Sequence, residues 1–307
     1  MTNIVPTLFL LILFCSCIPA QKKSLLSNEK DPENTIAIEA EAYIPDLSNT
    51  LTEISGLIKY DDLYWGINDS GGKDELYGFD RSGDIKRTVE IDDAGNDDWE
   101  SLTQNKKHIF IGDFGNNGGN RKNLCIYMIK KKDIDNDTQQ NAEAKKIEIE
   151  YASQERFGYS NMGTPYDCEA MIEFEGNLYL FSKNWADRTT VSCKVPEKKG
   201  KYKLHALDTF NVQGLITGAD IDPERRRLAL LGYENYKAFI WLFYDFEEDD
   251  FFSGKTEFIQ LPNLDDAQTE GICFLGSDSL LVSCENSRGI KQQVFLIDLS
   301  KPVNATY

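Results

Sequence analysis

Short segments that begin with an acidic residue recur along this sequence and carry the side chains best suited to chemistry. In each segment the acidic residue is followed closely by a small residue and an apolar one. The acidic residues are Glu53, Glu100, Glu169, Asp220 and Glu270, with Asp98 and Asp167 just before two of them. Recurrence at intervals of roughly 50 residues indicates one structural unit used several times.

A second set of polar residues ends the strand-like run that follows each segment. This set consists of Asp69, Asp113, Asn184, Glu234 and Glu285. In an antiparallel pair the start of one strand lies beside the end of the next, so both sets should meet on one face of the fold. Lys183 and Arg121 lie in or near the second set, where Gly- and Asn-rich loops could form an anion nest with them.

Carboxylates gathered this closely raise one another's pKa and require a compensating charge. Ca²⁺ accepts several oxygen ligands in flexible geometry and is the cofactor that such a ring favours. The alternative is that individual members hydrogen-bond turn amides and hold neighbouring units together. The predicted metal ligands are Glu100, Glu169, Asp220, Glu270 and Glu285. The predicted ligand rim is Glu53, Asp69, Asp98, Asp113, Asp167, Lys183, Asn184 and Arg121.

Other catalytic chemistry has little support in the sequence. The two histidines, His108 and His205, lie in strand-like runs, and no Gly-x-Ser-x-Gly motif occurs. Any catalysis would therefore use carboxylates or a metal-bound water.

The elements that position these residues are predicted to be β-strands. Each unit alternates apolar and polar residues and is rich in β-branched and aromatic side chains, which is typical of strands rather than helices. Four strands are expected in each unit except the last, which lacks a fourth. The strand expected at residues 36–43 would complete it. The fourth strands are expected at residues 88–91, 147–151, 202–206 and 258–261.

This organisation predicts an all-β β-propeller closed by an N-terminal strand. Five blades are expected, or six if an insertion hides a further one. The long interval between Glu100 and Glu169 is assigned to surface insertions within residues 130–146 and 154–165.

The N-terminal residues predict export. An apolar run at residues 8–14 is too short to span a bilayer and is typical of a signal peptide. Ser16-Cys17 resembles a lipobox, so residues 1–17 are assigned to the leader with lipidation at Cys17, and residues 18–33 to a flexible tether. The domain then covers residues 34–307. The expected location is the outer membrane or periplasm, with the lipid as the sole membrane contact; the alternative is secretion after cleavage at Ile18-Pro19-Ala20.

The net charge and the cysteine spacing argue against two kinds of function, nucleic-acid binding and cysteine-based metal or redox chemistry. A net charge of -18 would repel phosphate backbones, which makes nucleic acid an unlikely partner. The five cysteines beyond the leader lie in apolar runs without Cys-x-x-Cys spacing, and we expect them to be small core residues.

Six motifs taken in order resemble a group of exported bacterial propellers related in pattern to phytase-like and esterase-like propeller domains. The resemblance covers roughly residues 50–290, and it implies the fold, export and dependence on calcium. No complete phytase-type set of phosphate-binding Lys and Arg residues is present. The motifs are Asn68-Asp-Ser-Gly71, Asn96-Asp-Asp-Trp-Glu-Ser-Leu102, Ile111-Gly-Asp-Phe-Gly-Asn-Asn117, Asp167-Cys-Glu-Ala-Met171, Thr217-Gly-Ala-Asp220 and Thr269-Glu-Gly-Ile272.

Two functional classes follow from these residues. The first is a lipid-anchored scaffold whose calcium-binding mouth holds a small molecule, a glycan, a peptide or a protein. The alternative is a metal-dependent hydrolase of a phosphoester, ester or lactone, in which one spare carboxylate acts as base. The absence of a histidine pair or a serine nucleophile favours the first.

Overall fold

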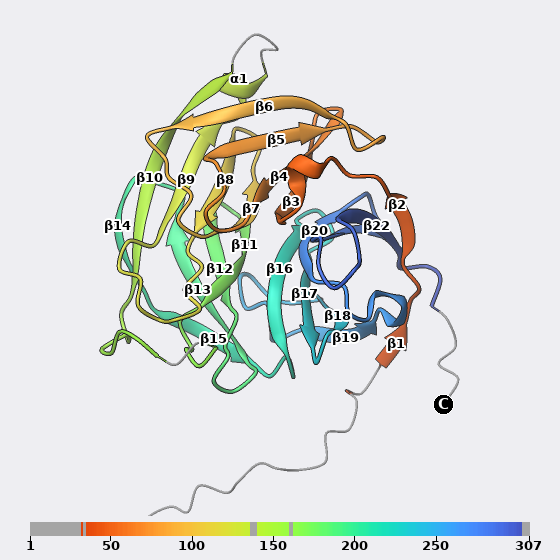
Figure 1. The fold of residues 1–307 in the computed structure, drawn as a ribbon. Helices are drawn as coiled ribbons and strands as arrows, with labels where there is room; N and C mark the ends of the chain where they lie inside the picture. Colours follow the sequence, from red (N-terminus) through yellow and green to blue (C-terminus); the bar gives the residue numbers. More distant parts are fainter. Residues whose placement is uncertain (1–31, 33–34, 136–139, 160–161, 303–307) are drawn as a thin grey trace, which may run out of the picture. The chain divides into compact units, whose positions relative to one another are not determined.

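Almost every regular element of this chain is a β-strand (Figure 1). The computed structural model describes residue 32 and residues 35–135, 140–159 and 162–302, all within one unit, Pro32–Tyr307. Helical elements in these ranges are short: η1 (Asn49–Leu51), α1 (Lys131–Ile134) and η2 (Pro262–Leu264). The all-β prediction is confirmed.

Antiparallel strands in sequence order form the repeating unit predicted from the sequence. The first group contains β3 (Ile54–Tyr60), β4 (Leu63–Asn68), β5 (Glu75–Phe79) and β6 (Ile85–Asp92). The second contains β7 (Trp99–Gln104), β8 (His108–Asp113), β9 (Cys125–Lys130) and β10 (Asn141–Tyr151). The third contains β11 (Cys168–Phe174), β12 (Asn177–Ser182), β13 (Thr190–Pro196) and β15 (Ala206–Phe210). The fourth contains β16 (Leu215–Asp222), β17 (Arg227–Glu234), β18 (Lys237–Tyr244) and β19 (Lys255–Gln260).

The last group is closed by a strand from the N-terminal end of the domain, as predicted. It contains β20 (Thr269–Phe274), β21 (Ser279–Cys284), β22 (Gln293–Asp298) and β2 (Glu41–Ile44), which pairs antiparallel with β22. The expected strand at 36–43 is in fact two strands, because β1 (Thr35–Ala37) pairs in parallel with β19 of the fourth group. Between them, the Asn263 side chain donates to the Ala40 carbonyl and accepts from its amide, which fixes the chain as it crosses from one group to the other.

The innermost strands form a closed cycle of neighbours. β3 contacts β7, β7 contacts β11, β11 contacts β16, β16 contacts β20, and β20 contacts β3. Apolar clusters fill the space between successive groups, and one of them joins the last group to the first through Cys273, Leu281 and Leu57. These packed layers bury the domain core between the groups rather than at the centre of the ring. The described cysteines are all buried and unpaired, as expected of core residues.

The number of blades stays a prediction. Hydrogen bonding joins the described strands into four sheets, because β6 pairs in parallel with β10 and so merges the first two groups into one sheet. β10 is long enough to do this because residues 141–143 pair with β6 before residues 144–148 pair with β9. The region assigned to a surface insertion therefore contains strand that joins two groups.

The fourth strand of the third group differs from the prediction. The interval 202–206 is divided between two strands that belong to different sheets. β14 (Gly200–Leu204) pairs in parallel with β10 of the second group, and β15 takes the outer position in the third group by pairing with β13. The alternation that suggested a strand is real, but Tyr202 and Leu204 pack in the cluster shared with the neighbouring group. β14 thereby covers the outer edge of β10, which would otherwise be free to pair with another chain.

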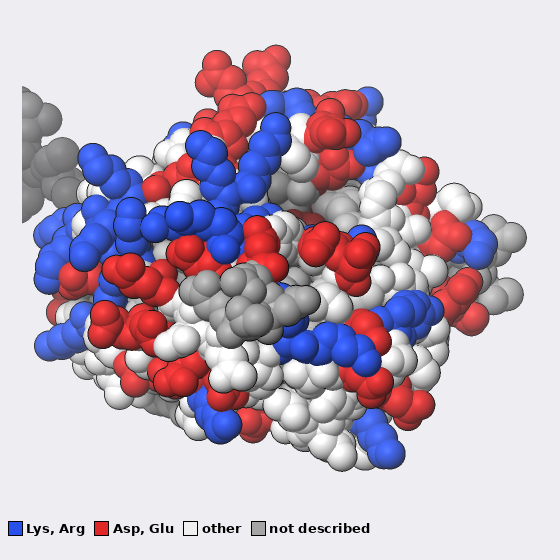
Figure 2. Space-filling model, turned by 90° about the horizontal axis from the view of Figure 1, so that it is seen from above, with Lys and Arg blue, Asp and Glu red and all other residues white. Residues whose placement is uncertain are grey.

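The surface carries both signs of charge despite the net negative total. Figure 2 shows acidic and basic side chains interspersed over one face, with basic side chains gathered on the left. β10 and β14 lie on that side in Figure 1, and they are joined by ion pairs between Lys201 and Glu148 and between Lys203 and Glu150. Within the described ranges, no helix has the length and hydropathy of a membrane span. The predicted leader, Cys17 and nearly all of the predicted tether lie outside the described residues.

Candidate functional site

A β-bulge at the same position of each group places the acidic residues. Where the innermost strand pairs with the second strand, the register shifts once, so two residues oppose one. Bulges of this kind re-aim a side chain away from the regular alternation. The residue that the shift leaves unpaired is Glu100, Glu169, Thr217 or Glu270 in four groups, and Gly56, directly after Ser55, in the first group.

Three of the five predicted acidic residues occupy this position, and two do not. Ser55 and Thr217 stand where Glu53 and Asp220 were expected, and each donates its hydroxyl to a carbonyl of the next innermost strand. Glu53 is exposed two residues earlier. Asp220 lies three residues later, where its carboxylate accepts from the Phe274 amide at 2.7 Å and lines a different cavity.

The residues that follow the second strands complete the site. Asp69, Lys183, Tyr233 and Glu285 occupy equivalent positions in four groups, and buried Phe114 takes this position in the second group. A cavity of about 580 Å³ lies here, lined by Asp69, Glu100, Glu169, Lys183, Tyr233 and Glu270 among others. We call this region the acidic mouth and define it by Asp69, Asp98, Glu100, Glu169, Lys183, Tyr233, Glu270 and Glu285.

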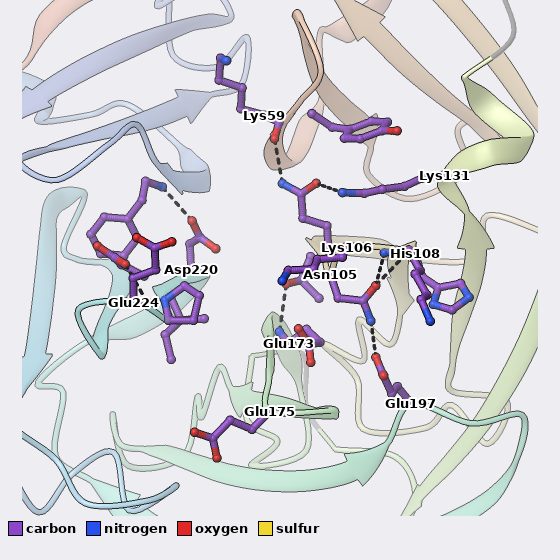
Figure 3. A pocket seen from close by; sticks show the side chains of 18 of the residues that line it. Lys59, Asn105, Lys106, His108, Lys131, Glu173, Glu175, Glu197, Asp220 and Glu224 are labelled. Atoms are coloured by element: carbon purple, nitrogen blue, oxygen red, sulfur yellow. Dashed lines mark hydrogen bonds between the residues drawn. The ribbon is translucent and has the colours of Figure 1, made fainter.

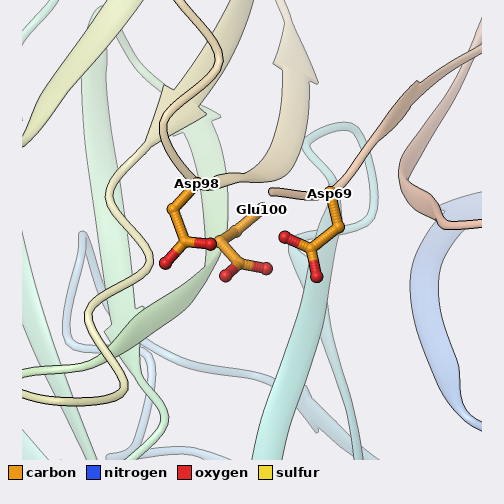
Figure 4. A group of neighbouring side chains, drawn as sticks. All are labelled: Asp69, Asp98 and Glu100. Carbon is orange, nitrogen blue, oxygen red and sulfur yellow. The ribbon is translucent and has the colours of Figure 1, made fainter. Parts of the chain in front are cut away.

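Three carboxylates converge at one side of the acidic mouth. Asp69, Asp98 and Glu100 each offer an oxygen, and these oxygens all lie within 4.8 Å of one another (Figure 4). Burial raises the pKa of Asp98 to about 7, and the negative charge of Asp69 adds to this shift. Burial also raises the pKa of Glu100 well above its usual range, reinforced by Glu169 and Asp69. Within the described ranges, the Glu100 carboxylate accepts no hydrogen bond, so little offsets its charge.

Lys183 neutralises a different carboxylate. Its Nζ lies 2.6 Å from both oxygens of Glu169, and both side chains are almost fully buried. Burial alone would lower the pKa of Lys183, but Glu169 and Glu270 raise it above its ordinary value. The ammonium also lies near the Trp185 and Tyr233 rings, at 5.1 and 5.5 Å from their centroids. Lys183 is therefore committed to Glu169.

The remaining two glutamates behave as weak acids. Burial raises the pKa of Glu270 to about 8, with Lys183 opposing the shift and Glu285 adding to it. Burial likewise raises the pKa of Glu285 to about 8, reinforced by Asp69. Without an added cation, both carboxyls are largely protonated at neutral pH.

Several predicted rim residues support the loops instead of lining the cavity. Asp113 accepts from Arg121 at 2.6 Å, and Arg121 also donates to the Gly115 carbonyl. Buried Asp167 accepts from the Asn116 amide and from Trp185 Nε1. The Asn184 side chain accepts from Ala186 and donates to Thr189 within its own turn. The alternative interpretation, in which acidic residues hold turn amides, is correct for Asp113 and Asp167.

These supports bring a glycine against the carboxylates. The loop held by Arg121 carries Gly115 so close that a Cβ there would collide with Glu100 Oε1 and Asp98 Oδ2. Glycine at this position therefore allows the backbone to approach the carboxylates closely.

Several residues of this cavity were not predicted from the sequence. Trp185, Arg188, Tyr233, Tyr236 and Arg288 also line the acidic mouth cavity. Four of them lie in turns, where neither strand periodicity nor the acidic motif extends. Their aromatic and basic types in short turns after β12, β17 and β21 were the available signal.

A second cavity lies where the innermost strands end. It measures about 1140 Å³ and is lined by Lys59, Lys131, Glu173 and Asp220 among others (Figure 3). We call it the mixed mouth, because both Lys and carboxylate side chains line it. Burial raises the pKa of Asp220 to about 7, but the Phe274 and Ile221 amides counter this.

Comparison with known proteins defines the fold. No family model matches the sequence, and neither does any curated protein. The glutaminyl cyclase of Myxococcus xanthus matches with a TM-score of 0.53 at 10% identity, covering 88% of this chain and 100% of that chain. A nidogen/laminin complex matches with a TM-score of 0.44 at 16% identity, covering 82% of this chain and 78% of that chain. An exo-β-1,3-galactanase from Phanerochaete chrysosporium matches with a TM-score of 0.48 at 8% identity, covering 88% of this chain and 64% of that chain.

These neighbours are β-propellers, and the likeness to the first supports that fold for this chain. At such identities a shared fold says nothing about chemistry. The β-propeller prediction is confirmed, whereas the phytase-like resemblance and export stay predictions.

Proposed function

We propose that this protein is an exported, ligand-binding β-propeller whose acidic mouth holds one divalent cation, Ca²⁺ in preference to others. The observation that carries this proposal is the convergence of Asp69, Asp98 and Glu100 within 4.8 Å. Hard carboxylate oxygens in an irregular arrangement suit Ca²⁺, which tolerates flexible geometry and fills its remaining positions with water or ligand oxygens.

The neighbouring cations support this assignment because they are engaged elsewhere. Lys183 is held by Glu169, and Arg121 is held by Asp113. The ligand set therefore changes from the sequence prediction: Asp69 and Asp98 join Glu100, while Glu169 remains with Lys183 and Asp220 lies at the other mouth. Glu270 and Glu285 stay within electrostatic reach and would lose their protons more readily beside a bound cation.

The biological role that fits is capture of a ligand outside the cytoplasm, with the lipid on Cys17 as the membrane anchor. A cavity of about 580 Å³ falls in the range typical of small-ligand sites. The cation would contribute binding energy and rigidity at the floor of that cavity.

Thermal unfolding tests the cation site. A cation bound only by the folded state adds about 2.7 kcal/mol at a hundredfold excess over Kd, so Ca²⁺ should raise Tm and a chelator should reverse the rise. The variant Asp98→Asn with Glu100→Gln should lose the response. Asp220→Asn is the matched control, because it neutralises a partly buried acidic residue of an innermost strand at the other mouth, and it should keep the full response. A Tm indifferent to Ca²⁺ and chelator would reject the proposal.

A metal-dependent hydrolase is the second candidate, favoured by two carboxyl groups within electrostatic reach of the cation site. Beside a bound cation Glu270 and Glu285 would be ionised, and one of them could accept a proton from a metal-bound water. Phosphoester, ester and lactone substrates assayed with Ca²⁺ and with chelator separate the two functions. Turnover that requires Ca²⁺ and is lost in Glu270→Gln would establish the hydrolase; no turnover on any of the three leaves binding as the function.

A further inference from the structure

The cavity above the carboxylates has basic side chains at its edge. Arg188, in the turn after β12, and Arg288, in the turn after β21, line the same cavity as Glu100 and Glu270. We call these two residues the basic rim. Each keeps 42% of its side chain exposed, so both can meet a ligand entering from solvent.

Aromatic rings hold both guanidinium groups in place. Arg288 lies 3.3 Å from the centroid of Tyr236, which in turn stacks on Tyr233 with an angle of 9° between the rings. Arg188 lies 5.7 Å from the centroid of Trp185. Such contacts orient a guanidinium while leaving its N–H groups free to donate.

The hydrogen-bonding capacity of the basic rim is not used up. Each guanidinium forms one ion pair longer than a hydrogen bond, Arg188 Nε with Glu234 at 3.6 Å and Arg288 Nη1 with Asp266 at 3.8 Å. The Nη1 atom of Arg188 is buried and has no hydrogen-bond partner within the described residues. A buried donor without a partner is costly, and an anionic ligand would supply the missing acceptor.

The backbone also points to a functional role. Arg188, Tyr236 and Arg288 have φ values of +61°, +64° and +52°, in the left-handed region where glycine fits at lower cost. Asn235 and Tyr236 together form the two-residue turn between β17 and β18, a turn whose second position usually carries glycine. Large side chains retained at three such positions around one cavity are strained residues of the kind found at ligand sites.

We infer that the acidic mouth binds an anionic sugar, with its carboxylate or phosphate on the basic rim and its hydroxyl groups directed to the carboxylate floor and the cation. The inference rests on the proposed cation site. Guanidinium groups recognise planar or tetrahedral oxyanions through paired N–H donors, whereas sugar hydroxyls can both ligate Ca²⁺ and donate to carboxylates. A simple anion would leave the remaining carboxyls, Glu270 and Glu285, without a ligand hydroxyl, and a neutral sugar would leave Arg188 Nη1 without an acceptor.

Calorimetry with three sugars of one skeleton tests this inference: glucuronate, glucose 6-phosphate and glucose, each titrated at saturating Ca²⁺. At least one of the two anions should bind, at least tenfold more tightly than glucose, and the two anions distinguish a carboxylate ligand from a phosphate ligand. The variant Arg188→Gly with Arg288→Gly should weaken anion binding at least tenfold. Because glycine relieves both left-handed positions, this variant should melt no lower than the unmodified protein.

Arg226→Gly is the matched control. Arg226 also has a positive φ of +50° and lies over aromatic rings, Phe174 and Phe246, but it does not line this cavity. It should leave sugar binding unchanged.

The two proposals fail in different ways. A Ca²⁺ response that survives in the Arg188→Gly, Arg288→Gly variant while neither anion binds the unmodified protein would overturn the anionic sugar alone. Equal affinity for glucose and both anions, or anion binding unaffected by the double variant, would also overturn it. If Ca²⁺ does not raise the Tm of the unmodified protein, the cation site itself is rejected.

Discussion

The acidic mouth and the mixed mouth of this propeller contain similar residue types, but their charged side chains are paired differently. At the mixed mouth, Lys131 donates to Gln104 at 2.7 Å, Asn105 donates to Glu197 at 2.6 Å, and Asp222 lies within 3.4 Å of Arg225 and Arg227. At the acidic mouth, Lys183 neutralises Glu169, but Asp69, Asp98 and Glu100 converge without a neighbouring cation of their own. Several charged groups of the mixed mouth thus have polar partners, although Asp220 has no basic partner among the described residues, whereas the carboxylates at Asp69, Asp98 and Glu100 are compensated by protons or by a bound cation.

The largest expected difference between the mouths concerns their two buried lysines. Lys183→Met would leave Glu169 buried and uncompensated, so the free energy of unfolding should fall by about 3–5 kcal/mol. Lys131→Met removes a hydrogen bond to a neutral amide and a contact with the Tyr60 ring, and it should cost only about 1 kcal/mol. Urea unfolding of both variants measures the difference. Equal losses would mean that Lys183 is not the main counter-charge of the acidic mouth.

The pH dependence of the free energy of unfolding should also differ between the two mouths. The pKa values of Glu270 and Glu285, about 8 in the folded protein, exceed their unfolded values. The folded state therefore binds more protons, and the stability from these groups, complete below the unfolded pKa, is lost as pH rises through about 8. Without metal, the free energy of unfolding should drop by roughly 3 kcal/mol for each of the two glutamates between pH 5 and pH 8.

Adding Ca²⁺ and substituting Asp220 show how much of this loss of stability comes from each mouth. Saturating Ca²⁺ should restore the part that comes from the acidic mouth. A smaller part should remain from Asp220, whose pKa is about 7, and Asp220→Asn should remove it. A metal-free protein whose stability is flat or rises over this pH range would show that the glutamates are ionised without cost.

The smallest effect distinguishes two glutamates within the acidic mouth. Glu270→Gln removes a repelling charge and should raise metal-free stability at pH 8 by about 1 kcal/mol. Glu169→Gln weakens the contact with Lys183 and should lower stability by about 1–2 kcal/mol. A ring of repelling carboxylates, as the sequence alone suggests, would raise Tm in both variants. A rise in Tm for Glu270→Gln with a fall for Glu169→Gln, measured by calorimetry, would support the Lys183–Glu169 pair. A rise in both would contradict it.

Much of the architecture was readable from the sequence because strand alternation and the recurring acidic segment repeat together. For this reason the recurring segment identifies Glu100, Glu169 and Glu270, which lie at equivalent bulges, while metal binding by them stays a prediction. Asp220 was misplaced because Thr217-Gly-Ala-Asp220 contains an acidic residue near, but not at, the bulge. Nothing in a linear pattern reveals which of two adjacent residues a bulge turns toward the cavity.

Other features could not be predicted because they depend on turn conformation or on contacts between residues distant in the sequence. Arg188, Tyr236 and Arg288 reach the cavity from left-handed turn positions, which follow no period. The pairing of β14 with β10 depends on burying Leu204 in a neighbouring group, which is a tertiary effect. Lys183 was expected to act with anions, yet its partner could be identified only once β11 and β12 were aligned.

Isothermal titration of the metal-free protein with Ca²⁺ at pH 8 tests the cation site most directly. We expect binding of one Ca²⁺ per chain, loss of at least tenfold in affinity in the Asp98→Asn, Glu100→Gln variant, and unchanged binding in Asp220→Asn. The absence of any binding heat together with no metal retained on equilibrium dialysis, or equal affinity in the unmodified protein and the double variant, would contradict a cation at Asp69, Asp98 and Glu100.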